Sequence, residues 1–91
     1  DISPLENVDL NLYPNPASEQ VTISFEAKKT ITNAKIMLFD LQGRLMLEQK
    51  ADNLNIGKHS FNIAINHLAK GNYVFVLMSE NGKTSKKITI Q

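Results

Sequence analysis

The side chains of this sequence that could carry metal-dependent chemistry are two histidines and a few scattered carboxylates. His59 and His67 are the only histidines; a predicted strand separates them, and no acidic pair adjoins either one. A zinc site needs three or four converging ligands, and Asp9, Asp52 and Glu80 are too far apart in sequence for a calcium loop. We therefore expect no metal or other cofactor, and we interpret both histidines as surface residues.

Nucleophilic catalysis has equally little support. The chain contains no cysteine, which removes disulfides, thiolate metal sites and thiol nucleophiles. Its serines and threonines are scattered through predicted strands and turns, and no nucleophile elbow, His-Glu pair or paired carboxylate lies near them. The sequence therefore indicates a protein that is not an enzyme.

Length and charge narrow the classes further. The 91 residues are expected to form one domain, and a domain of this size buries roughly 60 to 65% of the surface of its unfolded chain. A net charge of +1 gives no nucleic-acid or membrane-surface signal. No apolar run approaches the roughly 20 residues that cross a bilayer, and no secretory leader opens the chain. We expect neither nucleic-acid binding nor direct membrane insertion, and the start without methionine predicts a module cut from a longer precursor.

The elements that position the side chains are strands, because apolar and polar residues alternate along most of the chain. Turn signals recur roughly every eight to twelve residues. This spacing predicts an all-β fold, a seven-stranded antiparallel immunoglobulin-like β-sandwich without the cysteine pair or tryptophan of antibody domains. The predicted strands are residues 8–12, 20–26, 34–41, 45–49, 60–66, 73–78 and 84–91.

Two of the predicted turns have clear backbone chemistry. Gly43 suits a positive φ in the reversal after residue 39, and Asp40 can accept bonds from the amides of that turn. The Asn81-Gly82 pair predicts a tight hairpin with both residues at its centre.

Three further connections are predicted from composition. Residues 28–33 are polar enough to form a turn. Residues 52–58 are expected to form a loop that tucks Leu54 and Ile56 inward. Residues 66–71 are expected to form a single turn of helix that crosses between the sheets.

The segment Tyr13-Pro14-Asn15-Pro16 predicts a rigid corner, since two prolines fix φ at alternate positions. We interpret it as the entry that sets the register of the first strand; the alternative is a contact for a partner. It marks the border between residues 1–7, predicted to be the remnant of a linker, and a domain that extends over residues 8–91.

Five blocks of sequence stand out: LYPNPA at residues 12–17, VTI at 21–23, LFDLQGR at 38–44, LAKGNY at 68–73 and KKITI at 86–90. Taken together, they resemble the type A C-terminal sorting domain of the type IX secretion system, the Por secretion system C-terminal domain family. They follow the order and spacing of that family over nearly the whole chain. The resemblance gives a motif role in the structure to Tyr13, Pro14, Asn15, Pro16, Asp40, Gly43, Gly71 and Tyr73.

The resemblance implies a C-terminal secretion and sorting signal of Gram-negative bacteria. Such a domain directs an attached N-terminal cargo domain, in transit through the periplasm, across the outer membrane for cleavage and attachment to the cell surface. The implied partners are components of the type IX translocon and of its sortase. The cut would fall at or upstream of residues 1–7, and the match to the end of the family predicts that the chain stops at Gln91.

The expected recognition surface is the last strand with its positive charge, since Lys83, Lys86 and Lys87 cluster there and no acidic residue follows Glu80. A receptor could bind it by strand addition or by charge complementarity. The predicted set is Lys83, Lys86, Lys87, Ile88, Thr89, Ile90 and Gln91.

A second candidate surface follows from the alternation of two neighbouring strands. If Ile36 and Leu38 face the core, then five apolar residues form a strip on the outer face of the sheet. The strip could contact the cargo domain, a second copy of the module in a homodimer, or a secretion component; alternatively, lysine stems and the loop of Leu54 and Ile56 cover it. Its members are Met37, Phe39, Val74, Val76 and Met78.

A rival interpretation is an immunoglobulin- or fibronectin-like accessory module of a secreted enzyme, either a binding module or a spacer. Exposed coplanar aromatic rings would support carbohydrate binding, but the chain has four phenylalanines, two tyrosines and no tryptophan, mostly at core positions. A spacer would predict further chain beyond Gln91.

Overall fold

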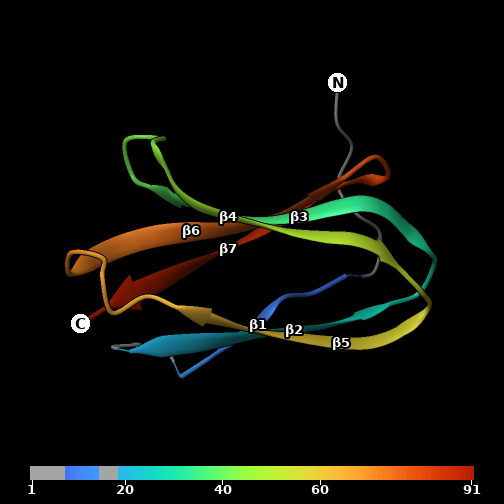
Figure 1. Ribbon diagram of the computed structural model, residues 1–91, viewed down its shortest axis with the longest axis horizontal. Helices are drawn as coiled ribbons and strands as arrows, with labels where there is room; N and C mark the ends of the chain where they lie inside the picture. Colours follow the sequence, from blue (N-terminus) through green and yellow to red (C-terminus); the bar gives the residue numbers. More distant parts are fainter. Residues whose placement is uncertain (1–7, 15–18) are drawn as a thin grey trace.

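Two antiparallel sheets packed face to face make up the computed structural model, which describes residues 8–14 and 19–91 (Figure 1). One sheet has the strand order β1-β2-β5 and the other β4-β3-β6-β7. This arrangement confirms the all-β, seven-stranded immunoglobulin-like sandwich. The strands are β1 Asn11–Tyr13, β2 Gln20–Ala27, β3 Ile31–Asp40, β4 Leu45–Leu54, β5 Gly57–Ala64, β6 Gly71–Ser79 and β7 Gly82–Ile90.

The core forms where the alternating residues of both sheets meet. On β6, Tyr73, Phe75 and Leu77 point inward, and Phe75 is completely buried. On β2, Val21 and Ile23 face them from the other layer with at most 1% exposure. Burial of such side chains contributes roughly 1.5 to 3 kcal/mol each, so the interlayer contact supplies most of the stabilisation of the fold.

β3 and β4 extend further than the sequence indicates, whereas β1 is shorter, since it covers Asn11–Tyr13 and not residues 8–12. β3 begins at Ile31, so residues 28–33 are only partly turn, and β4 continues to Leu54, where the sequence predicts a loop. The extension depends on irregular pairing, in which Asn33 and Asp52 both adopt a positive φ, 53° and 58°. Local composition could not predict this extension, because the polar residues of both segments remain in their strands by forming β-bulges.

The connection between β4 and β5 is shorter than the predicted loop at residues 52–58, and this affects where its two apolar side chains lie. Leu54 points inward, as predicted, and is 6% exposed. The prediction for Ile56 is wrong, because this side chain is 68% exposed. Only Asn55 and Ile56 separate β4 from β5, and so short a link cannot fold back over the core.

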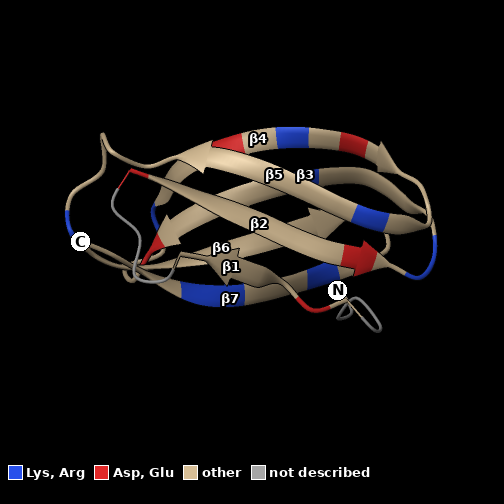
Figure 2. Ribbon diagram, turned by 90° about the horizontal axis from the view of Figure 1, so that it is seen from below, with Lys and Arg blue, Asp and Glu red and all other residues tan. Residues whose placement is uncertain are grey.

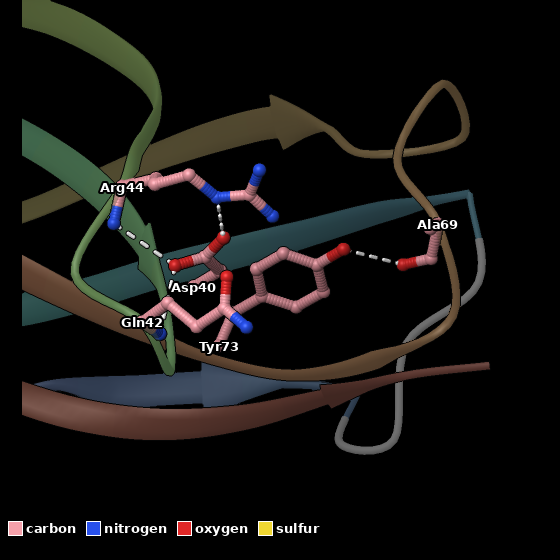
Figure 3. Close-up of polar contacts among 5 residues, drawn as sticks. All are labelled: Asp40, Gln42, Arg44, Ala69 and Tyr73. Carbon is pink, nitrogen blue, oxygen red and sulfur yellow. Dashed lines mark hydrogen bonds and ion pairs between the residues drawn. The ribbon is translucent and has the colours of Figure 1, made fainter.

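The crossing between the sheets, at residues 66–71, is not helical. Leu68 N donates to the carbonyl of Ile65 at 3.0 Å, which forms one turn. The hydroxyl of Tyr73 then donates to the carbonyl of Ala69 at 2.6 Å (Figure 3). This is the tyrosine corner of immunoglobulin-like sandwiches; the side chain satisfies a carbonyl that a helix would have bonded internally, and Gly71, at φ 150°, leads into β6.

The β6–β7 hairpin turns one residue earlier than predicted. Its loop consists of Glu80 and Asn81, while Gly82 is the first residue of β7, with φ 136°. Two bonds fix this loop against β3: Glu80 N donates to the carbonyl of Thr32 at 3.0 Å, and Thr32 N donates to Asn81 Oδ1 at 2.7 Å. These contacts with a distant strand shift the loop, so the Asn-Gly pair alone could not locate it.

The β3–β4 hairpin is held by one carboxylate, as Figure 3 shows. Asp40 Oδ1 accepts the backbone N–H groups of Gln42 and Arg44, both at 2.9 Å, and Oδ2 contacts Arg44 Nε at 2.6 Å. The bond from the Arg44 amide, with the Arg44 guanidinium and the Gln42 amide, lowers the pKa of Asp40 from its ordinary value of 3.8. Gly43 turns the chain with φ 87°.

The tyrosine corner can be tested with Tyr73→Phe, which removes the hydroxyl and leaves the buried ring. We expect the free energy of unfolding to fall by about 1 kcal/mol, because the Ala69 carbonyl loses its bond. Tyr13→Phe is the matched control, since Tyr13 is 52% exposed, and it should leave the stability unchanged. Denaturant titration measures both variants; equal effects would contradict the role of the Tyr73 hydroxyl.

The Asp40 turn predicts an acid-dependent loss of stability. Because the folded state lowers this pKa, the contribution is fully present above 3.8 and is lost as the pH falls through the lowered value. Asp40→Asn should therefore be less stable than the wild type at neutral pH, with a difference that shrinks as the pH falls well below 3.8.

Thermal unfolding over a pH series measures the effect of Asp40→Asn. Arg44→Gln keeps both amide bonds to Asp40 and should change the stability less. A difference between wild type and Asp40→Asn that is the same at every pH would refute the assignment.

Candidate docking edge and outer sheet face

The C-terminal strand β7 forms one border of the four-stranded sheet. It pairs with β6 over all nine residues without a register shift, and no other strand of residues 8–14 and 19–91 pairs with its second side. In Figure 2, β7 lies along one border of the molecule and carries blue segments, which mark Lys and Arg, while β4 lies along the opposite border. β7 is therefore a long, regular and basic edge strand.

The predicted recognition residues divide between the core and the surface. Ile88 and Ile90 are 1% and 3% exposed and belong to the core. Lys83, Lys86 and Lys87 are exposed. The isoleucines therefore hold β7 in place, and the lysines are available to a partner. Of the two remaining residues, Thr89 bonds Asn72 through its hydroxyl at 2.9 Å, and Gln91 is exposed after the strand.

Register determines on which face each lysine lies. Lys87 is opposite Val74, and Lys83 is opposite Met78, so both side chains lie on the outer face of the sheet. Lys86 is opposite the fully buried Phe75. It therefore occupies an inward position on an edge strand and is nonetheless exposed.

The apolar strip lies on the outer face, as its alternation predicts. Met37 pairs with Val76, and Phe39 pairs with Val74, while Met78 is opposite Lys35. Met37 is 8% exposed, and the other four members are partly exposed. The five side chains are thus cross-strand neighbours in one continuous strip.

Charged side chains border this strip on both sides. Lys83 and Lys87 lie along β7, and Lys35 forms an ion pair of 3.3 Å with Glu48 of β4. Leu54 is part of the core and Ile56 is exposed. The alternative of a cover made by the loop of Leu54 and Ile56 therefore does not hold for Leu54.

Sequence analysis missed one apolar neighbour of the strip. Leu45, at the start of β4, is 50% exposed and lies opposite Phe39. The pairing depends on an irregularity between Leu38 and Phe39. No signal in the sequence locates that bulge, so Leu45 could not be assigned to the outer face.

The family-motif residues lie mostly at turns. Tyr13 ends β1 and is followed by a cis peptide bond to Pro14, and both side chains are exposed; Asn15 and Pro16 lie outside the described residues. The other four lie at two corners: Asp40 and Gly43 in the β3–β4 hairpin, Gly71 and Tyr73 at the entry of β6. Figure 3 shows Asp40 and Tyr73 at these corners.

The histidines occupy different environments. His59 is half-buried, with Nε2 2.8 Å from the carbonyl of Asn55 and its ring 5.7 Å from that of Phe25, so the description as a surface residue fits only His67, which is exposed. Within the described residues, no group of three or more His, Cys, Asp or Glu side chains could hold a metal ion.

An open depression lies beside the irregular part of β3 and β4. Its lining includes one carboxylate, Asp52, and two ammonium groups, Lys35 and Lys50. It contains no pairing of a nucleophile with a base. Over residues 8–14 and 19–91 there is also no helix long and apolar enough to cross a membrane.

Comparison with solved structures shows the same fold in larger proteins. PorZ, an essential bacterial surface component of the type IX secretion system of Porphyromonas gingivalis, aligns with a TM-score of 0.67 and 16% identity over 90% of this chain. The chain spans only 11% of the PorZ chain. The C-terminal domain of Wzt is also similar, with a TM-score of 0.56 and 9% identity over 100% of this chain and 76% of that one. A β-glucosidase involved in saponin metabolism from intestinal bacteria aligns with a TM-score of 0.57 and 9% identity over 91% of this chain and 16% of that one.

Comparison of sequences places the chain more specifically. No curated protein matches it. A family model described as "Secretion system C-terminal sorting domain" matches residues 11–91, which is almost all of the sandwich. The chain therefore belongs to the family of secretion system C-terminal sorting domains, and it is a sorting signal of the type IX secretion system.

Proposed function

We propose that this domain is recognised through β7 by components of the type IX translocon, which thereby export an N-terminal cargo domain. Domains of this family belong to proteins that the system secretes to the cell surface or beyond. The observation that carries the proposal is that β7 has buried isoleucines and exposed lysines on the same strand. Ile88 and Ile90 anchor the strand in the core, while Lys83 and Lys87 project from a regular edge.

The route that we propose has three steps. The folded domain crosses the periplasm with its cargo, the translocon binds it at the outer membrane, and sortase components cut the chain at or upstream of residues 1–7. In this scheme residues 1–7 are linker and residues 8–91 are the signal. The domain itself has no catalytic role, which agrees with its membership of a family of sorting signals.

A fusion experiment tests this function. Residues 1–91 are attached to a periplasmic reporter in a host with a working type IX system, and surface delivery and cleavage of the reporter are measured. We expect delivery in this host and none in the same host without the translocon. Delivery that persists without the translocon would refute the proposed pathway.

Two variants of the fusion separate recognition from folding. Deletion of residues 87–91 should abolish delivery, but it also removes the buried Ile88 and Ile90. Replacement of Lys83, Lys86 and Lys87 by serine leaves the core intact, since all three side chains are exposed. It should reduce delivery while the circular dichroism spectrum stays unchanged.

For the apolar strip, we propose a contact with the cargo domain or a secretion component rather than with a second copy. A symmetric dimer that stacks β7 of one copy on β7 of the other would bring Lys83 and Lys87 of both copies together, and like charges at an interface are unfavourable. We expect the isolated domain to sediment as a monomer over a wide range of concentration. A concentration-dependent dimer that Val76→Lys abolishes would contradict this expectation.

A further inference from the structure

Four strand edges border the two sheets, and they differ in how well they could accept another strand. They belong to β1, β5, β4 and β7. β1 has only three residues, and the pairing of β4 contains three register shifts. Short and bulged edges resist strand addition. β5 and β7, with eight and nine regularly paired residues, are therefore the two edges that remain suitable.

The hairpin fixes which backbone groups of β7 point away from the sheet. Ser79 pairs with Gly82 across a two-residue loop, and in such a hairpin the pair that flanks the loop exchanges both backbone bonds. Every second residue from Gly82 onward therefore bonds β6. The residues between them direct N–H and C=O groups to the second side of β7, and they include Lys83, Ser85 and Lys87.

Charge distinguishes β7 from β5. Ile65 N donates to the carbonyl of Glu19, and this bond fixes which residues of β5 bond β2. The outward-bonding residues of β5 are therefore Lys58, Ser60, Asn62 and Ala64. Only one of these side chains, that of Lys58, is charged. On β7 the outward-bonding positions instead carry two lysines, four residues apart and on one face.

A second copy of this chain is a poor occupant of the β7 edge. If two β7 strands paired antiparallel about Ser85, Lys83 of each copy would face Lys87 of the other. If they paired about Lys86 or Lys87, that lysine would face its own equivalent. Lysines on an edge strand disfavour such self-pairing.

We propose that β7 accepts an extended acidic segment of a secretion component as an added strand, with two carboxylates four residues apart opposite Lys83 and Lys87. The backbone of the segment would bond the N–H and C=O groups of Lys83, Ser85 and Lys87, and its two carboxylates would lie on the outer face of the sheet. This inference rests on the proposed function and names the partner of the same surface.

The primary test uses proline to block the edge. Ser85→Pro removes one outward donor and leaves the bonds to β6 in place, because proline is tolerated at edge positions whose N–H is not used. Ser60→Pro does the same on β5 and is the matched control. In the reporter fusion, we expect delivery to fall about tenfold or more for Ser85→Pro and to stay unchanged for Ser60→Pro.

Charge reversal supplies a second variant in case Ser85→Pro fails to fold. Lys83→Glu with Lys87→Glu should reduce delivery about tenfold. The control is Lys29→Glu with Lys58→Glu, which changes the net charge equally at exposed positions away from β7. If the wild-type fusion is delivered and both β7 variants are delivered as well as their controls, the inference is wrong and the sorting function stands. If the wild-type fusion is not delivered, the sorting function itself fails.

A binding measurement examines the carboxylate spacing directly. Two extended peptides of alternating threonine and valine carry two glutamates each, either four or three residues apart, and are titrated into the 91-residue chain. We expect the first peptide to shift the amide resonances of Lys83, Ser85 and Lys87 and to bind about fivefold more tightly, since only that spacing puts both carboxylates on one face. Equal binding of the two peptides, or no shift at these three amides, would overturn the proposal.

Discussion

The constraint on which the rest of this structure depends is the fixed alternation of β6 between the two faces of its sheet. Tyr73, Phe75 and Leu77 fill the space between the layers, and each is 5% exposed or less. Because β6 pairs with both β3 and β7, its register also determines the outer residues of its neighbours. A slip of one residue would expose these three buried side chains to solvent, and the loss of folding free energy would be far larger than the contribution of any surface contact.

Anchoring at the ends of β6 keeps this register unique. The Tyr73 hydroxyl ties the start of the strand to Ala69, and the loop at its far end is bonded to Thr32 of β3. β7 follows directly from that loop. The positions of Lys83 and Lys87 thus depend on contacts made by residues that the functional surface does not include.

Sequence patterning predicts the layers of this fold better than their irregularities. The alternation at residues 21–25 and the apolar run at 73–78 are enough to assign inward and outward faces, since burial requires a period of two. Ile56 shows the limit: its apolar character suggests burial, but the unforeseen continuation of β4 through the bulge at Asp52 leaves it exposed. The candidate surface divides in the same way. The lysines of β7 are evident in the sequence, whereas the pairing of Leu45 with Phe39 depends on a bulge that no local pattern encodes.

A sorting domain must avoid binding its own copies and still be bound by one receptor, and the lysines of β7 can serve both requirements. An exposed ion pair contributes only about 0 to 1 kcal/mol, so Lys83 and Lys87 cannot supply the affinity of a complex by themselves. Backbone bonds along an added strand can supply it, but they would be offered equally to any extended chain. In this scheme the backbone of β7 provides attraction without selectivity, and the lysine spacing provides selectivity with little attraction. Each is insufficient alone, which explains why a regular edge and a specific charge pattern occur on the same strand.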